Sequence, residues 1–260
     1  SRPFGRALDR LYGKAGGEAA EARLGNLFGS ARNYVAAGLH QRRPGTMLYV
    51  TRGARQAEKI EADLLNFLPD ESVTLFPQWE VLPYEDSRPE PGIVGPRIEA
   101  LSRLMHMVTG VTVVPVRALL QRVVAPGDFS LRETKLTLGE AVELDTLLTE
   151  LVRMGFTREA MVEEVGTFSV RGGILDIYGY DMENPVRIEL FGDEIVDMRC
   201  FEIATQRSVD KLEQVRLLPV GEPFDWKRNG GQGGAARLGD LVDYLAPGSL
   251  VLFYVRQKVL

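Results

Sequence analysis

Two short apolar runs constrain the fold of this chain more than any other feature. Thr46–Thr51 and Val111–Val116 are almost entirely hydrophobic and lack the polar alternation of a strand with one solvent-facing side. Such runs are typical of strands buried on both faces of a parallel sheet. Between them, Arg52–Leu68 carries apolar residues three and four positions apart, which predicts an amphipathic helix. Alternating strands and helices predict an α/β class.

The pattern changes near Pro126. Beyond it, the chain shows two-residue periodicity, which predicts strands with one buried face. Gly172-Gly173 and Gly192-Asp193 predict tight turns between these strands. The four predicted strands are Phe168–Arg171, Ile174–Tyr178, Pro185–Phe191 and Glu194–Arg199.

These changes predict the domain organisation. We expect a flexible lead-in at 1–23 and a parallel-sheet, nucleotide-hydrolase-like domain in two parts, 24–126 and 218–260. A small antiparallel α+β domain at 127–217 interrupts it. The Gly-rich composition of residues 229–234 predicts a linker. Further predicted elements are helices at Leu24–Leu39 (around a break at Gly29-Ser30), Arg97–Thr109, Arg117–Val123, Leu144–Met154 and Leu238–Leu245, and strands at Val73–Phe76 and Leu250–Tyr254.

Composition narrows the function classes. With 260 residues, 45% of them hydrophobic, the chain can bury one large core or two smaller ones. A net charge of -5 argues against sequence-independent nucleic-acid binding. Cys200 is the single cysteine, so no internal disulfide can form, and no apolar run reaches membrane-spanning length. The chain lacks an initial Met and stops after a strand-like run, so we expect a fragment of a longer protein.

A phosphate-binding loop would be placed just before the helix near residue 30. Such a loop needs glycines, a lysine for the phosphates and a Ser or Thr for magnesium. Here Gly29-Ser30 precedes Ala31, Arg32 and Asn33, which occupy the glycine, lysine and hydroxyl positions. The segment is either a degenerate phosphate loop with vestigial anion affinity or an ordinary helix start, and the residues favour the second.

Other chemistry-bearing residues are sparse. His40 and His106 fall on separate predicted helices, and Cys200 has no histidine partner motif. No spacing typical of metal ligands occurs. The sequence therefore predicts no catalytic residue, no metal site and no cofactor.

Several segments, in this order and spacing, resemble one family. From about Leu24 to Pro219 the chain resembles the N-terminal module of bacterial transcription-repair coupling factors, the Mfd family. That module is similar to the first domains of the excision-repair protein UvrB. The segments are Phe76–Glu85, Val114–Val123, Phe168–Ile177 and Arg187–Ile195.

UvrB itself is the close alternative. UvrB-like proteins carry an intact phosphate loop, which this chain lacks. They also have a long DNA-gripping β-hairpin, for which Asp86–Pro96 is too short. The sequence of Trp79–Tyr84 is more similar to the corresponding loop of the coupling factors than to the tyrosine-rich loop of UvrB. These three features favour the coupling-factor family.

One strand face is the candidate interface. Alternation places Arg187, Glu189 and Phe191 on the side opposite the core-facing residues, and Arg and Phe anchor interfaces well. The resemblance implies that Arg171, Arg187 and Phe191 contact UvrA, the damage-recognition ATPase. One departure is Ser169, where UvrB-like proteins have a second arginine. The alternative is a solvated face of weak ion pairs, with Phe191 tucked under its turn.

The resemblance also implies the wider role. The full-length parent resembles an ATP-dependent DNA translocase that pushes stalled RNA polymerase off double-stranded DNA in the bacterial cytoplasm. ATP and magnesium would act only in motor domains absent from this sequence. We therefore expect a non-enzymatic module that recruits UvrA. The alternatives are a UvrB-like DNA-damage-binding fragment and a vestigial ATP-binding domain.

Overall fold

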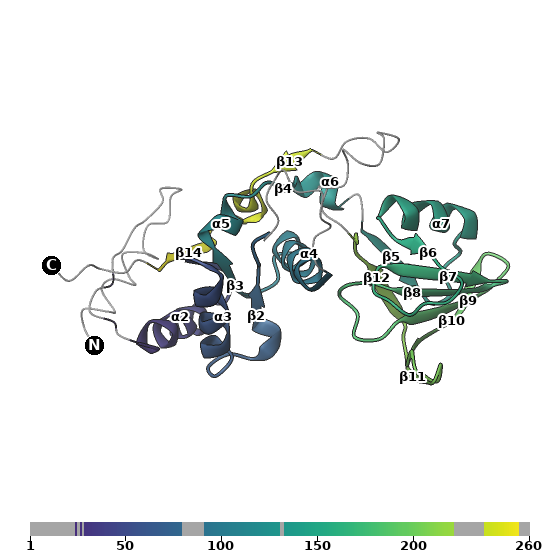
Figure 1. Cartoon of the computed structure of the whole chain (residues 1–260), viewed down its shortest axis with the longest axis horizontal. Helices are drawn as coiled ribbons and strands as arrows, with labels where there is room; N and C mark the ends of the chain where they lie inside the picture. The colour runs from purple at the N-terminus through teal and green to yellow at the C-terminus, as the bar shows by residue number, and fades with distance from the viewer. Residues whose placement is uncertain are drawn as a thin grey trace.

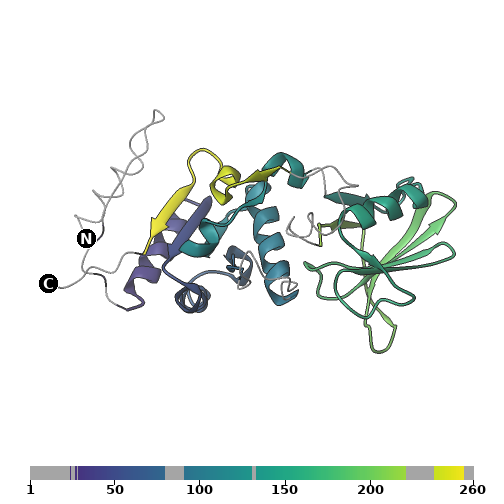
Figure 2. The same cartoon turned by 45° about the horizontal axis from the view of Figure 1, so that its top comes forward.

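The computed structural model describes residues 24, 27, 29–79, 91–130, 133–220 and 237–254. They form two bodies side by side, and the view turned by 45° shows the same separation (Figures 1 and 2). We call them the parallel-sheet region (residues 29–130 and 237–254) and the six-stranded region (residues 133–220). The described chain is again part of the parallel-sheet region from residue 237 onward, and its last strand pairs with its first.

The parallel-sheet region is built on four strands in the order β14-β1-β3-β2, all parallel. A separate two-stranded antiparallel ladder joins β13 to β4. The elements are α2 (Ala31–Arg42), β1 (Thr46–Thr51), α3 (Ala54–Leu64), η1 (Asp70–Ser72), β2 (Val73–Leu75), α4 (Pro91–Met105), β3 (Gly110–Pro115), α5 (Val116–Leu119), β4 (Val123–Val124), α6 (Pro126–Ser130), β13 (Leu238–Gly239), η3 (Leu241–Tyr244) and β14 (Leu250–Phe253).

Strand β1 explains the layers of this region. Met47 and Tyr49 belong to the core cluster formed with α2 and α3. Leu48 and Val50 belong to the other cluster, formed with α4, α5 and η3. Because side chains alternate across a strand, the sheet is covered on both faces, as its apolar runs require.

The six-stranded region has the strand order β11-β10-β9-β8-β7-β6, antiparallel except for the β6–β7 pair. Strand β12 pairs with β5 in a separate antiparallel ladder. The elements are β5 (Thr134–Thr137), α7 (Leu144–Arg153), β6 (Thr157–Arg158), β7 (Thr167–Arg171), β8 (Ile174–Tyr178), β9 (Val186–Phe191), β10 (Glu194–Phe201), β11 (Ser208–Lys211) and β12 (Gln214–Leu217).

Helix α7 covers one face of the six-stranded sheet (Figure 1). Its Leu147 and Leu151 are buried in a cluster with Phe168 of β7, Leu175 of β8 and Ile188 of β9. Leucines at i and i+4 share one face of a helix, so this spacing directs the helix onto the sheet. The opposite face of the sheet, which we call the outer face, is left for polar side chains.

The α/β class with a parallel sheet is confirmed. The helix predicted at Leu238–Leu245 is wrong. Leu238 pairs with β4 as a strand, and a short 3₁₀ helix follows, closed by reciprocal hydrogen bonds between Asp240 and Asp243. Two acidic residues three apart favour a capped turn, because each carboxylate satisfies a free backbone N–H.

Other helix boundaries also differ from the prediction. The helix predicted at Arg52–Leu68 spans only Ala54–Leu64 (α3), and the one predicted at Arg117–Val123 is the short α5, with Val123 in β4. Helix α2 begins only at Ala31, after Gly29 turns with a φ of 54°. Helix α4 begins at Pro91, before the predicted start at Arg97, and continues through Pro96. It ends where Met107 adopts a positive φ of 50°, a common helix stop. The lead-in at 1–23 and the linker at 229–234 lie outside the described residues.

Candidate protein-docking face

The outer face of the six-stranded sheet gathers polar side chains into one row. Ser169 of β7 lies opposite Asp176 of β8, which lies opposite Arg187 of β9. Arg187 in turn lies opposite Arg199 of β10. Because neighbours across a sheet have their Cβ atoms about 5 Å apart, the register alone brings these groups into contact range.

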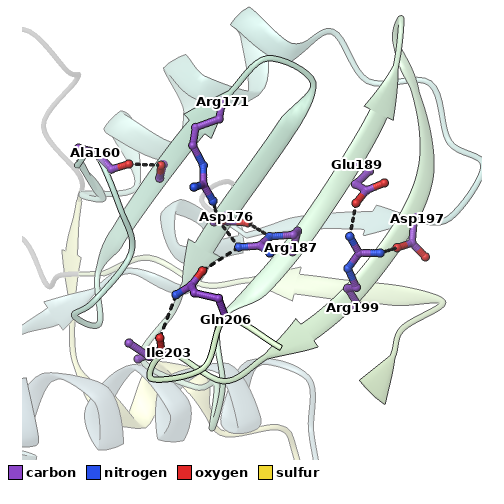
Figure 3. A network of polar contacts seen from close by, with 10 residues as sticks. Ala160, Arg171, Asp176, Arg187, Glu189, Asp197, Arg199, Ile203 and Gln206 are labelled. Carbon is purple, nitrogen blue, oxygen red and sulfur yellow. Dashed lines mark hydrogen bonds and ion pairs between the residues drawn. The ribbon is translucent and has the colours of Figure 1, made fainter. Parts of the chain in front are cut away.

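Asp176 is the hub of this row (Figure 3). Arg187 donates from Nε to Asp176 Oδ1 at 2.7 Å and from Nη2 to Oδ2 at 2.9 Å. Arg171, at the end of β7, donates from Nη2 to the same Oδ2 at 2.9 Å. The Asp176 side chain is only 2% exposed. A buried carboxylate is tolerated only when paired, and here two guanidinium groups supply the pairing.

Arg187 turns inward from the surface. Its side chain is 14% exposed, and its guanidinium carbon lies 4.3 Å from the centre of the Phe201 ring. It also donates to Gln206 Oε1 at 3.0 Å. The hydrogen bond to Asp176 is the main cause that raises the pKa of Arg187 above its ordinary value. Arg187 is therefore a fixed cation that forms part of the sheet surface.

Phe191 stands at the tip of the β9–β10 hairpin and is 81% exposed. Gly192 follows it with a φ of 63°, as expected at the first position of a tight hairpin turn. The alternative that Phe191 tucks under this turn is wrong. Nearby, a Cβ on Gly173 would lie 2.5 Å from the carbonyl oxygen of Leu190, so glycine permits the close approach of β8 and β9 there.

The position of Ser169 has no room for a larger side chain. Ser169 is 1% exposed and donates from Oγ to the carbonyl oxygen of Ala160 at 2.9 Å. An arginine at this position would have to displace the segment around Ala160. The departure from the UvrB-like pattern is therefore built into the local packing.

A second polar cluster lies beside the first. Arg199 contacts both Glu189 and Asp197 on the outer face. Glu189 belongs to the predicted face, whereas Asp176, Phe201 and Gln206 were not predicted. The sequence could have indicated Asp176, because a carboxylate between Leu175 and Ile177 in an apolar strand needs a hydrogen-bonding partner. Phe201 ends β10, two residues beyond the predicted strand, and Gln206 lies in the loop after it, so the predicted strand pattern encodes neither contact.

The predicted phosphate-loop residues use their side chains internally. Asn33 is 4% exposed, donates from Nδ2 to Asp63 Oδ2 at 2.8 Å and accepts from Tyr49 at 3.0 Å. Ser30 donates to the same Asp63 oxygen at 3.0 Å. Burial is the main cause that raises the pKa of Tyr49 to about 12.

Arg32, which occupies the lysine position of that loop, is also engaged. It donates to the carbonyl oxygen of Leu27 at 2.7 Å and lies 4.5 Å above the centre of the Tyr254 ring. Ala31 begins α2, and Gly29 precedes it in the turn. The carboxylate of Asp63 thus lies against the start of α2, at the position where a phosphate would need hydrogen-bond donors.

The remaining candidates carry little chemistry. His40 is 6% exposed, and burial lowers its pKa. His106 Nε2 lies 2.6 Å from Glu133 Oε2 on the surface. Burial raises the pKa of the Cys200 thiol. Among the described residues, no group of three His, Cys, Asp or Glu could hold a metal ion. No helix in the described part of the chain is long and apolar enough to cross a membrane.

A cavity of about 610 Å³ lies between α4 and the six-stranded region. Three acidic and three basic side chains line it, so it has no charge preference for a ligand of one sign. They are Glu99, Asp181, Glu183, Arg103, Lys135 and Arg216. Burial raises the pKa of Asp181 to about 6. This mixed lining leaves the outer face as the stronger candidate.

Comparison with known proteins identifies the family of the segment that contains this face. Residues 134–222 match the family model of the UvrB interaction domain. A transcription-repair-coupling factor of Mycobacterium bovis is 40% identical over 213 residues, covering 79% of this chain and 17% of the relative. Those of Myxococcus xanthus and Bacillus subtilis are 36% and 34% identical over 85% and 78% of this chain, and 19% and 17% of the relatives.

The fold and the matched domain thus define an α/β protein with a UvrB-type interaction domain. The chain belongs to the transcription-repair-coupling factor family. It spans less than a fifth of the length of these relatives.

Proposed function

We propose that the six-stranded region docks onto UvrA and thereby recruits this damage-recognition ATPase in transcription-coupled nucleotide excision repair. The docking surface would be the outer face, with Arg171, Arg187 and Phe191 as the residues on which binding depends. In this role the chain binds a partner and hydrolyses no ATP.

One observation carries the proposal. Phe191 is 81% exposed at the hairpin tip, next to a face that bears two arginines around one carboxylate. A large exposed aromatic ring beside arginine is the composition of an interface anchor. This face lies within the segment that matches the UvrB interaction domain. The partner that fits it presents an apolar pocket for the ring and an acidic group for Arg171.

The domain division belongs to the same proposal. We infer that residues 127–217 are an inserted domain between the two parts of the parallel-sheet domain, 24–126 and 218–260. Pairing of β14 with β1 supports this, because it joins the two ends of the chain in one sheet.

A degenerate phosphate loop also fits this proposal. Asp63 bonds Ser30 and Asn33, and Arg32 is engaged by Leu27 and Tyr254. These contacts support a helix start without nucleotide affinity. They weigh against the vestigial ATP-binding domain, and micromolar binding of an ATP analogue would restore that alternative.

The wider partners are proposals for the whole protein. RNA polymerase and double-stranded DNA would be engaged by parts beyond this chain, where ATP and magnesium would also act. The bacterial cytoplasm is the compartment in which that machinery operates. For this chain itself, a net charge of -5 weighs against the UvrB-like DNA-binding alternative.

Titration calorimetry with purified UvrA tests the proposal. We expect saturable binding by the wild-type chain and its loss when Arg171, Arg187 and Phe191 are all replaced by alanine. Unchanged affinity in the triple variant would remove the site assignment, and no binding by the wild type would remove the function. A parallel titration with duplex DNA should show no affinity that falls steeply with salt.

A further inference from the structure

The carboxylate of Asp176 serves two arginines that differ in their environment. Asp176 lies in the middle of β8, with Ser169 on one side and Arg187 on the other. Both its oxygens accept from Arg187, and Oδ2 also accepts from Arg171. Figure 3 shows the two side chains converging on it from β7 and β9.

Arg187 has little surface left for a partner. Its Nε and Nη2 donate to Asp176 and Gln206, and its planar face covers the Phe201 ring at 4.3 Å. Only 14% of the side chain is exposed. Gln206 is itself fixed, because its Nε2 donates to the carbonyl oxygen of Ile203 at 2.9 Å.

Arg171 is placed differently. Its side chain is 48% exposed, and within the described part of the chain one donor, Nη2, is hydrogen-bonded to Asp176. A guanidinium has five N–H donors, so most of its hydrogen-bonding capacity is not used among the described residues. The single contact with Asp176 orders the end of a long side chain before any partner arrives, which lowers the entropy lost on binding.

We propose that Asp176 is the positioning residue of the docking face. Arg171 and Phe191 contact the partner, and Arg187 acts through Asp176 by holding its carboxylate in place. This inference rests on the proposed docking function. It assigns to the partner a carboxylate for Arg171 next to an apolar pocket for Phe191.

A double-mutant cycle tests the inference. UvrA is titrated with the wild-type chain, Asp176→Asn, Arg171→Ala and the double variant. Asparagine keeps the shape of the side chain but removes the charge that holds Arg171. We expect about tenfold weaker binding for Arg171→Ala, about fivefold for Asp176→Asn, and no further loss in the double variant. Losses that multiply would overturn the inference.

Asp197→Asn is the matched control. Asp197 lies on the same face and pairs with Arg199, but no described contact links it to Arg171. We expect its binding to stay within about twofold of the wild type. A loss as large as that of Asp176→Asn would show a general effect of charge on the face and would contradict the positioning role.

A second cycle covers the case in which Asp176→Asn does not fold. Arg187→Gln leaves Asp176 paired with Arg171. If Arg187 acts only through Asp176, Arg187→Gln adds no loss to Arg171→Ala. A further loss would mean that Arg187 touches the partner directly, which overturns the inference.

The free chain offers a readout independent of binding. In ¹⁵N relaxation, the Arg171 Nε–Hε group should be ordered in the wild type and mobile in Asp176→Asn. Equal mobility in both would overturn the inference. If the wild type itself does not bind UvrA, the proposed function fails with it, whereas wild-type binding with multiplying losses removes only this inference.

Discussion

Replacing Phe191 with alanine separates docking from folding. The ring is 81% exposed, so the folded chain gains little from it. We expect the free energy of unfolding to change by no more than about 0.5 kcal/mol. The effect on docking should be much larger, because the ring becomes buried only in the complex.

The magnitude follows from the exposed area. A phenylalanine presents on the order of 200 Å², and 81% exposure leaves most of it available for a partner. Truncation to alanine forfeits roughly 100 Å² of apolar burial, which at about 25 cal/mol per Å² is about 2.5 kcal/mol. This corresponds to a roughly 60-fold increase in Kd.

Calorimetric titration against UvrA and thermal unfolding by circular dichroism measure the two effects. Leu120→Ala is the control, because Leu120 is 77% exposed but follows α5 in the parallel-sheet region. Its affinity should equal that of the wild type. The reasoning fails if Phe191→Ala binds within about threefold of the wild type, or if it unfolds far more easily.

Three further predictions concern stability. Gly173→Ala would bring a Cβ to 2.5 Å from Leu190 O, so we expect about 1–3 kcal/mol of destabilisation in urea unfolding; unchanged stability would contradict the crowding. Arg97 is fully buried, stacks 4.5 Å from the Trp79 ring and donates to Pro77 O at 2.6 Å, so Arg97→Met should lose about 3 kcal/mol in the same assay; a smaller loss than 1 kcal/mol would oppose this account. Burial lowers the pKa of His40 below 6.5, so the unfolded state binds its proton more readily and stability should fall as pH drops below 6.5. His40→Gln should reduce that dependence in melts across pH, and an unchanged slope would assign it to other groups.

The fold class was readable from the sequence because apolar runs and turn glycines are local signals. Thr46–Thr51 became β1 with unchanged bounds, and Ile174–Tyr178 became β8. The helix predicted at Leu238–Leu245 failed because pairing with β4 and the Asp240–Asp243 cap outweighed the apolar spacing. Boundaries depend on such contacts, which no local window contains.

Only part of the candidate face could be predicted from the sequence. Strand alternation identifies the side on which Arg187 and Phe191 lie, and the structure separates them into a partly buried cation and an exposed ring. Asp176 determines that difference, because its carboxylate draws Arg187 down onto the sheet. A pattern of period two gives the face of a residue but not its partners across three strands.

Photocrosslinking from position 191 tests the central claim most directly. A photoreactive phenylalanine analogue at Phe191 preserves the aromatic ring, and the same analogue at Leu120 serves as the control. In the presence of UvrA, the account predicts a crosslinked product from position 191 and none from position 120. Equal crosslinking from both positions, or crosslinking from position 120 alone, would contradict the claim that the hairpin tip docks.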